Sequence, residues 1–141
     1  MSALTFWQRE RIRAGYDLVR PKITEFSRRF YDHLFSAHPE YRNLFPEDMT
    51  AQLVRFVQFW EATVGMVDRL DECEPTFRKL GQTHREYGIK PSDFQAVGEA
   101  LLATLPEFLG QQYTPEDADA WATLYTVVSS GMISNMEENA A

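Results

Sequence analysis

The sequence lacks several features that would define common protein classes. Cys73 is the single cysteine among 141 residues. One cysteine cannot form an intrachain disulfide or a multi-cysteine zinc or iron–sulfur site, and such sparing use is typical of a reducing compartment. There is no long apolar run, and the first residues lack the apolar core of a signal peptide. We therefore expect a cytoplasmic protein with no membrane partner.

The chain also has few basic residues relative to acidic ones. It carries 14 lysines and arginines against 21 acidic side chains, for a net charge of -7. This balance argues against nucleic acid as the main partner. Hydrophobic residues make up 44% and charged residues 25%, which is ordinary globular composition. We expect one domain over residues 1–141, as a monomer or a homodimer.

Apolar residues recur with helical spacing along almost the whole chain, and no segment alternates as a strand would. Helices are expected over about residues 5–19, 21–38, 49–70 and 74–88, with two more that open at residues 91–93 and 114–117. Thr5 and Gln8 form a predicted capping box, and Gly88 is a predicted C-terminal cap. The sequence therefore predicts an all-α domain of six or seven helices.

One of the three histidines lies on an apolar helix face. His33 has charged neighbours and is expected to face solvent, while His38 precedes a proline and is expected to cap a helix. His84 differs because its predicted face is apolar and aromatic. That face also carries Phe77, Leu80 and Tyr87. An inward imidazole needs partners for its two nitrogens.

Two interpretations of His84 follow from the residues alone. Taken by itself, an inward histidine is more often a core residue bonded to a backbone carbonyl than a metal ligand. However, no second histidine, cysteine or carboxylate pair lies at ligand spacing, so a zinc or non-haem iron site has no ligands. A single protein ligand is consistent with haem, which fills the other positions of its iron. The aromatic fraction of 13%, with ten phenylalanines, would accommodate such a flat apolar group.

Four stretches of the chain resemble bacterial globins, specifically the haem domains of flavohaemoglobins and their single-domain relatives. These stretches are residues 30–35 (FYDHLF), residues 38–46 (HPEYRNLFP), residues 80–102 from Leu-Gly-Gln-Thr-His to Val-Gly-Glu-Ala-Leu-Leu, and residues 119–121 with Tyr125. Their order and spacing cover nearly the whole chain. The resemblance implies the globin fold, a 3-on-3 helical sandwich around a pocket for haem b.

The resemblance also implies roles for individual residues. His84 matches the proximal iron ligand, and Tyr31 and Gln52 match the distal tyrosine and glutamine. Phe45 matches the phenylalanine that stacks on haem. The remaining residues expected to bind the cofactor are Phe56, Leu80, Phe94, Val97 and Leu101. The alternatives are a core tyrosine at Tyr31, and at Gln52 either a solvated helix residue or a side chain that reaches the iron itself.

The chain departs from the flavohaemoglobin pattern on the proximal side. In those enzymes a tyrosine and a glutamate polarise the proximal histidine, whereas the matching positions here are Phe94 and Met136. Neither side chain can accept the imidazole N–H as a carboxylate does. The chain also ends about where a haem domain would, so no reductase module is expected.

These features favour reversible binding of oxygen or another diatomic gas, such as nitric oxide or carbon monoxide. The alternatives are a nitric oxide dioxygenase or weak peroxidase with a separate reductase, a gas or redox sensor acting through a partner protein, and a helical interaction module with no cofactor.

Overall fold

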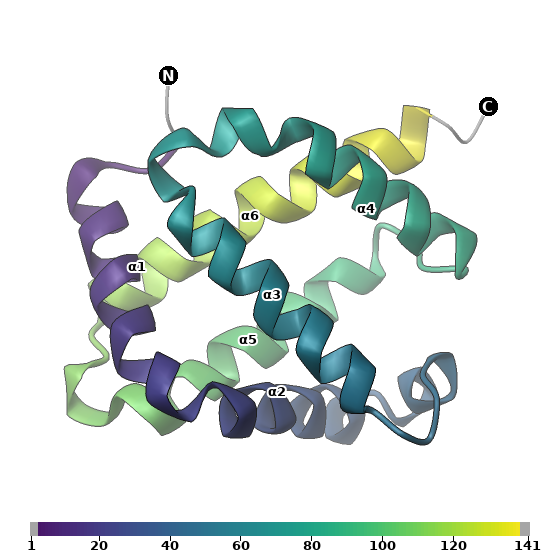
Figure 1. The fold of residues 1–141 in the computed structure, drawn as a ribbon, viewed down its shortest axis with the longest axis horizontal. Coiled ribbons are helices and arrows are strands. Elements are labelled where there is room, and N and C mark those ends of the chain that lie inside the picture. Colours follow the sequence, from purple (N-terminus) through teal and green to yellow (C-terminus); the bar gives the residue numbers. More distant parts are fainter. Residues whose placement is uncertain (1–2, 139–141) are drawn as a thin grey trace.

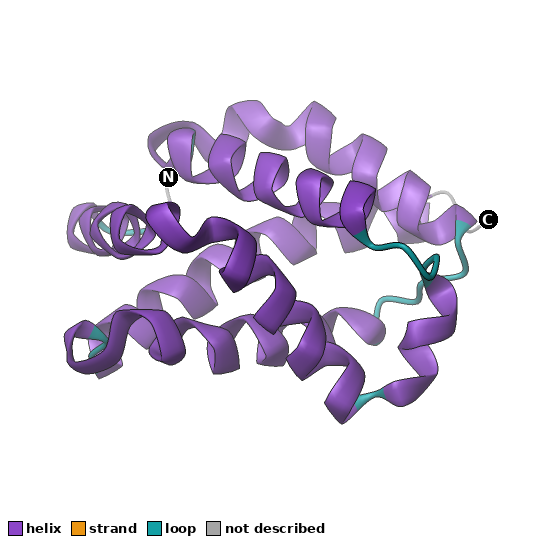
Figure 2. Ribbon diagram, turned by 60° about the horizontal axis from the view of Figure 1, so that its bottom comes forward, coloured by secondary structure: helices purple, strands orange, loops and turns teal. Residues whose placement is uncertain are grey.

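The structure, a computed structural model, describes residues 3–138 and is helical along nearly all of that range, with no strand in it (Figures 1 and 2). The α-helices are α1 (Phe6–Val19), α2 (Ile23–Ala37), α3 (Thr50–Gly65), α4 (Glu74–Glu86), α5 (Asp93–Leu109) and α6 (Pro115–Glu138). Four 3₁₀ turns connect them, namely η1 (Arg20–Lys22), η2 (Pro39–Leu44), η3 (Val67–Cys73) and η4 (Gly110–Gln112). The all-α prediction is confirmed.

Local hydrogen bonds explain where α1 and α6 begin. The backbone N–H of Gln8 donates to Thr5 Oγ1 at 3.1 Å, and the backbone N–H of Thr5 donates to Gln8 Oε1 at 2.9 Å. Thr114 and Asp117 exchange the equivalent pair at the start of α6. Each pair satisfies backbone donors that a helix start leaves open. The capping box predicted from Thr5 and Gln8 is therefore confirmed.

The helix expected over residues 49–70 is wrong at its C-terminal end. α3 stops at Gly65, and the chain continues as η3, in which Arg69 has non-helical backbone angles. Val67 is nevertheless 1% exposed, so the apolar periodicity continues across the break. Asp68 of η3 forms ion pairs with Arg9 and Arg13 of α1, which hold this turn against the first helix. Periodicity alone could not show that the helix ends earlier.

Helices α4 and α6 pack backbone against backbone (Figure 1). A Cβ atom added to Gly81 of α4 would lie 2.4 Å from the carbonyl oxygen of Met132. A Cβ atom added to Gly131 of α6 would lie 2.9 Å from a ring carbon of Phe77. Side chains larger than hydrogen at these two positions would force the helices apart. The glycines therefore fix the position of α4, the helix that carries His84.

An ion-pair group joins α2 to α5. Both carboxylate oxygens of Glu107 accept hydrogen bonds from Arg29, at 2.9 and 3.1 Å. Nε2 of His33 lies against the same carboxylate. Arg29 and His33 together lower the pKa of Glu107 to about 2. The sequence predicted that His33 faces solvent, and the structure shows it partly exposed but paired with a residue 74 positions away.

We expect the Gly81→Ala variant to be destabilised by about 1–3 kcal/mol, because the new methyl group meets backbone that cannot move aside. Gly65→Ala is the matched control, since a Cβ atom there has nothing within 4 Å. Urea denaturation followed by circular dichroism measures both. Equal stability of the two variants would contradict the packing described for α4 and α6.

We expect Glu107→Gln to lower the free energy of unfolding at pH 7 by less than about 1 kcal/mol, because the carboxylate is about one-third exposed. Its folded pKa of about 2 lies below the ordinary value of 4.5, so its contribution is complete above pH 4.5 and is lost as the pH falls toward 2. Urea titrations of the wild-type and Glu107→Gln proteins between pH 4.5 and 2 measure their free energies of unfolding. The difference between the two values should decrease as the pH falls. A difference that does not change with pH would disprove this assignment.

Candidate functional site

Tyr31 and Gln52 meet where α2 approaches α3. The amide Nε2 of Gln52 donates a hydrogen bond to the phenolic oxygen of Tyr31 at 2.8 Å. Tyr31 is 7% exposed, and burial raises the pKa of its phenol, an effect that the Gln52 hydrogen bond partly offsets. The phenol therefore stays protonated at neutral pH. Because its oxygen accepts from Gln52, its own proton is available to a third group.

An aromatic cluster holds the Tyr31 ring. Phe45 and Phe56 contact it at centroid distances of 5.5 and 5.7 Å, both edge to face. Phe30 and Phe35 contact the same ring from α2 itself. Phe56 is buried, whereas Phe45 is half-buried and keeps part of its surface free. The phenol is thus fixed among rings, with its oxygen at the polar edge of the cluster.

The segment that carries Phe45 is held by Arg42, which the sequence analysis did not single out. Arg42 donates to the carbonyl oxygens of Phe45, Pro46 and Glu47, at 3.3, 3.0 and 3.0 Å. One guanidinium thus satisfies three carbonyl groups that no helix covers. The loop that follows η2 is therefore ordered by side-chain bonds. The only local sign of this contact in the sequence is the position of Arg42, three residues before Phe45.

A second bond joins η2 to the start of α5. The Tyr41 hydroxyl donates a hydrogen bond to Asp93 at 2.7 Å. Burial, and to a smaller extent the Asp93 carboxylate, raise the pKa of Tyr41 to about 12. His38 stacks on the Tyr41 ring at 5.1 Å, so its ring packs beside the helix end where capping was expected. Together these contacts connect the Phe45 segment to the helix that carries Phe94.

His84 occupies the last turn of α4 and is half-buried. Its Nδ1 lies 2.6 Å from the carbonyl oxygen of Leu80. A carbonyl only accepts, so Nδ1 carries the proton and Nε2 carries the lone pair. Within residues 3–138 no hydrogen bond is formed by Nε2. The carbonyl bond is common to both interpretations of His84, but a free Nε2 lone pair is what a metal ligand requires.

Gln52 and His84, which are predicted to lie on opposite sides of a haem group, are carried by two helices that diverge. In Figure 1, α3 and α4 separate from η3, the turn that joins them. Gln52 is in the first turn of α3 and His84 in the last turn of α4, so both lie at the end away from η3. No cluster of three or more histidine, cysteine or carboxylate residues that could hold a metal occurs in the described part of the chain. This donor set fits a group such as haem, which needs one axial imidazole and otherwise apolar walls.

The predicted apolar wall residues differ in how much surface they leave free. Leu80 and Val97 are half-buried and pack against the core. Phe94 is 7% exposed, and its ring lies 5.6 Å from the His84 ring. Leu101 is 1% exposed, because neighbouring side chains cover it almost completely. Contact of these residues with a cofactor remains a prediction.

Tyr87 does not lie on the inward face of α4, contrary to the sequence interpretation. It is 70% exposed and is the residue at which the helix ends. The chain then turns at Gly88, which has a φ of 84°, in the left-handed region that favours glycine. Helical spacing therefore no longer determines the direction of Tyr87. The predicted cap at Gly88 is confirmed.

Behind His84, the side chain of Tyr125 anchors α5. Its hydroxyl donates to the carbonyl oxygen of Phe94 at 2.6 Å, and a Cβ atom added to Gly98 would lie 2.7 Å from the Tyr125 ring. Burial raises the pKa of this phenol. Met136 is 3% exposed and buried in the core. The acceptor for the His84 N–H is thus the Leu80 carbonyl, which is neutral.

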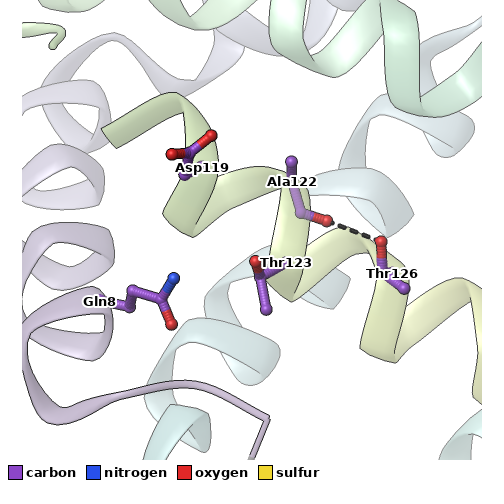
Figure 3. A pocket seen from close by; sticks show the side chains of 5 residues that line it. All are labelled: Gln8, Asp119, Ala122, Thr123 and Thr126. Atoms are coloured by element: carbon purple, nitrogen blue, oxygen red, sulfur yellow. Dashed lines mark hydrogen bonds between the residues drawn. The ribbon is translucent and has the colours of Figure 1, made fainter. Parts of the chain in front are cut away.

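A shallow hollow elsewhere on the molecule shares no residue with this site. It lies between α1 and α6 and is lined by Gln8, Asp119, Ala122, Thr123 and Thr126 (Figure 3). Its lining mixes polar and apolar groups and includes no histidine. The hollow is therefore separate from the groups around Tyr31 and His84.

Comparisons with known proteins identify the family of this chain. The sequence pattern of the globin family matches residues 28–132. A flavohemoprotein of Bacillus subtilis is 32% identical over 108 residues, which cover 74% of this chain and 27% of that protein. A neuroglobin of Tetraodon nigroviridis is 28% identical and is matched over 99% of this chain and 96% of its own length. The chain belongs to the globin family.

Solved structures show the same fold. An engineered carbene transferase, a candidate nitric oxide dioxygenase from Rhodothermus marinus, superposes with a TM-score of 0.85 at 21% identity, over 96% of this chain and 94% of that one. A bacterial globin from Campylobacter jejuni gives 0.81 at 18% identity, over 95% and 97%. The predicted globin fold is therefore confirmed.

The chain spans about a third of the length of the flavohemoproteins it matches, for example 34% of the one from Bacillus anthracis. None of the helices described here is long and apolar enough to cross a membrane.

Proposed function

We propose that this globin binds haem b through His84 Nε2 and reversibly binds a diatomic gas, with oxygen as the favoured ligand. The observation that carries the proposal is the hydrogen bond from Gln52 to Tyr31, which leaves the phenolic proton free. Haem would supply an iron atom with one coordination position open to a gas. Leu80, Phe45, Phe94 and Val97 would form apolar walls, with Phe56 and Leu101 behind them.

On the proximal side, the chain's own contribution is to orient one imidazole. The Leu80 carbonyl holds the Nδ1 proton, and the Phe94 ring lies against the His84 ring, so Nε2 has a fixed direction. A carbonyl is a weaker acceptor than a carboxylate, so it draws the Nδ1 proton away less strongly. An imidazole held in this way would favour gas binding over peroxidase-like chemistry if it bound the haem iron.

On the distal side, Tyr31 and Gln52 supply hydrogen-bond donors in an apolar surrounding. Burial among Phe45, Phe56 and neighbouring rings excludes water, which strengthens a hydrogen bond from the phenol to a polar gas. Oxygen gains more from such a donor than carbon monoxide does, because it carries more negative charge when bound. The donor pair therefore supports oxygen as the preferred ligand.

A second candidate function is nitric oxide dioxygenation with a separate reductase. It is favoured by the similarity to flavohemoproteins and to the Rhodothermus marinus protein. The neutral acceptor on His84 argues against it. Mixing the oxygenated ferrous protein with nitric oxide and a reductase distinguishes the two. Sustained turnover well above background would favour the enzyme, and a single turnover would favour the binding protein.

We further propose a cytoplasmic monomer or homodimer, with no nucleic-acid partner, in keeping with the net charge of -7.

We expect His84→Ala to lose most of its affinity for haem, because the variant lacks the imidazole nitrogen that the proposal assigns to the iron. The measurement is haem transfer followed by the visible spectrum, and added imidazole should restore much of the wild-type spectrum. His33→Ala is the control and should bind haem normally, since that ring pairs with Glu107. A His84→Ala protein with the wild-type ferrous spectrum would exclude His84 as the ligand.

We expect Tyr31→Phe to speed oxygen dissociation by roughly tenfold or more, because one buried hydrogen bond to the gas is lost. Stopped-flow displacement of oxygen by carbon monoxide measures the rate. Tyr113→Phe, which changes a half-buried tyrosine between α5 and α6, serves as the control. An unchanged rate for Tyr31→Phe would show that this phenol does not reach the gas.

A further inference from the structure

The hydrogen bond between Gln52 and Tyr31 has a neighbour on the outer side. Arg55 lies one turn further along α3, and its Nη2 donates to Gln52 Oε1 at 2.9 Å. Residues three apart on a helix share a face, which brings the two side chains together. Arg55, Gln52 and Tyr31 therefore form a continuous chain of two hydrogen bonds that runs from the surface into the aromatic cluster.

Each member of this chain has a different capacity to donate and accept. A guanidinium can only donate, so it must meet the oxygen of the Gln52 amide and not the nitrogen. The amide nitrogen of Gln52 then points the other way, toward Tyr31, and donates to the phenolic oxygen. The phenolic proton is consequently not used within the chain. The direction of both hydrogen bonds follows from the Arg55 guanidinium, because this group cannot accept a hydrogen bond.

Without Arg55, the amide of Gln52 could rotate by half a turn. Its oxygen would then face Tyr31 and accept the phenolic proton, which is an equally good hydrogen bond. In that arrangement Tyr31 has no proton to offer a gas. The two orientations occupy the same space, so packing does not choose between them.

We propose that Arg55 is a positioning residue that fixes the orientation of the Gln52 amide and thereby keeps the Tyr31 proton free for the bound gas. This role rests on the proposed gas-binding function. Arg55 is exposed, so water competes for Gln52 when the arginine is removed and the effect is moderate. The positive charge of Arg55 also acts to lower the pKa of Tyr31, against the larger effect of burial, which agrees with their proximity.

The test compares four variants of the full chain loaded with haem. Arg55→Met should raise the oxygen dissociation rate about twofold to fivefold, the size expected for one exposed hydrogen bond. Arg55→Glu should raise it further, because a carboxylate only accepts and reverses the amide. Arg55→Lys, which keeps a group that only donates, should stay near wild type. Arg28→Met removes the same charge from an exposed position of α2 and is the control.

A double-mutant cycle separates positioning from a direct effect of charge. In a Gln52→Leu background the amide is absent, so Arg55→Met and Arg55→Glu should leave the dissociation rate unchanged within about twofold. The infrared C–O stretch of the carbon monoxide complex should shift toward that of Tyr31→Phe in both Arg55 variants, and only when Gln52 is present. Equal effects in the two backgrounds would overturn the proposal.

A second readout does not depend on gas binding. In the NMR spectrum of the carbon monoxide complex, or of the purified chain if it takes up no haem, the Gln52 side-chain amide is observed directly. With Arg55 present, Tyr31→Phe should shift this signal strongly because Nε2 faces the phenol. In the Arg55→Glu variant, adding Tyr31→Phe should shift the Gln52 amide signal only slightly. If Tyr31→Phe shifts the Gln52 amide signal equally in both backgrounds, the role of Arg55 is refuted. If the shifts are as expected but the protein has no Soret band, only the proposed function is refuted.

Discussion

The site depends on one interaction, the hydrogen bond from His84 Nδ1 to the carbonyl oxygen of Leu80. It places the imidazole proton on one nitrogen and the lone pair on the other, and it fixes the ring within the last turn of α4. The backbone contact of Gly81 with α6 fixes that turn in space. The Nε2 lone pair is therefore positioned by helix packing and a backbone carbonyl. No acidic side chain among the described residues is needed for this.

The contact between Tyr31 and Gln52 has a different physical basis. Tyr31 and Gln52 come from separate helices, and their hydrogen bond forms where aromatic rings exclude water. The direction of this hydrogen bond is set by Arg55, which can only donate and therefore binds the oxygen of the Gln52 amide. Glycine contacts and the Glu107 ion pairs hold the helices in place, while short chains of hydrogen bonds orient the polar side chains of the candidate site.

Sequence reasoning succeeded where the signal was local. The capping box of Thr5 and Gln8 and the turn at Gly88 depend on residues a few positions apart, and both are present. It failed where tertiary contacts decide. The apolar periodicity continues through Val67 although α3 ends at Gly65, and Tyr87 leaves the inward face because the helix stops there.

The residues of the candidate site also differ in whether the sequence could identify them. The resemblance to bacterial globins identified Tyr31 and Gln52, and the structure brings them together from 21 positions apart. Arg42 and Arg55 were missed because charged residues on a helix or turn are usually solvated. Their spacing of three residues from Phe45 and Gln52 was the only local signal. A bond from His84 to a backbone carbonyl was one interpretation of the sequence, but side-chain identity could not specify that the carbonyl belongs to Leu80.

The most direct test of the central claim is the resonance Raman spectrum of the ferrous protein without a gas ligand. If His84 is the axial ligand, an iron–histidine stretching band should be present, and it should shift when histidine is labelled with ¹⁵N. The band should be typical of a neutral imidazole that donates to a carbonyl, and it should be lost in His84→Ala. A spectrum with no histidine-dependent band would contradict the account.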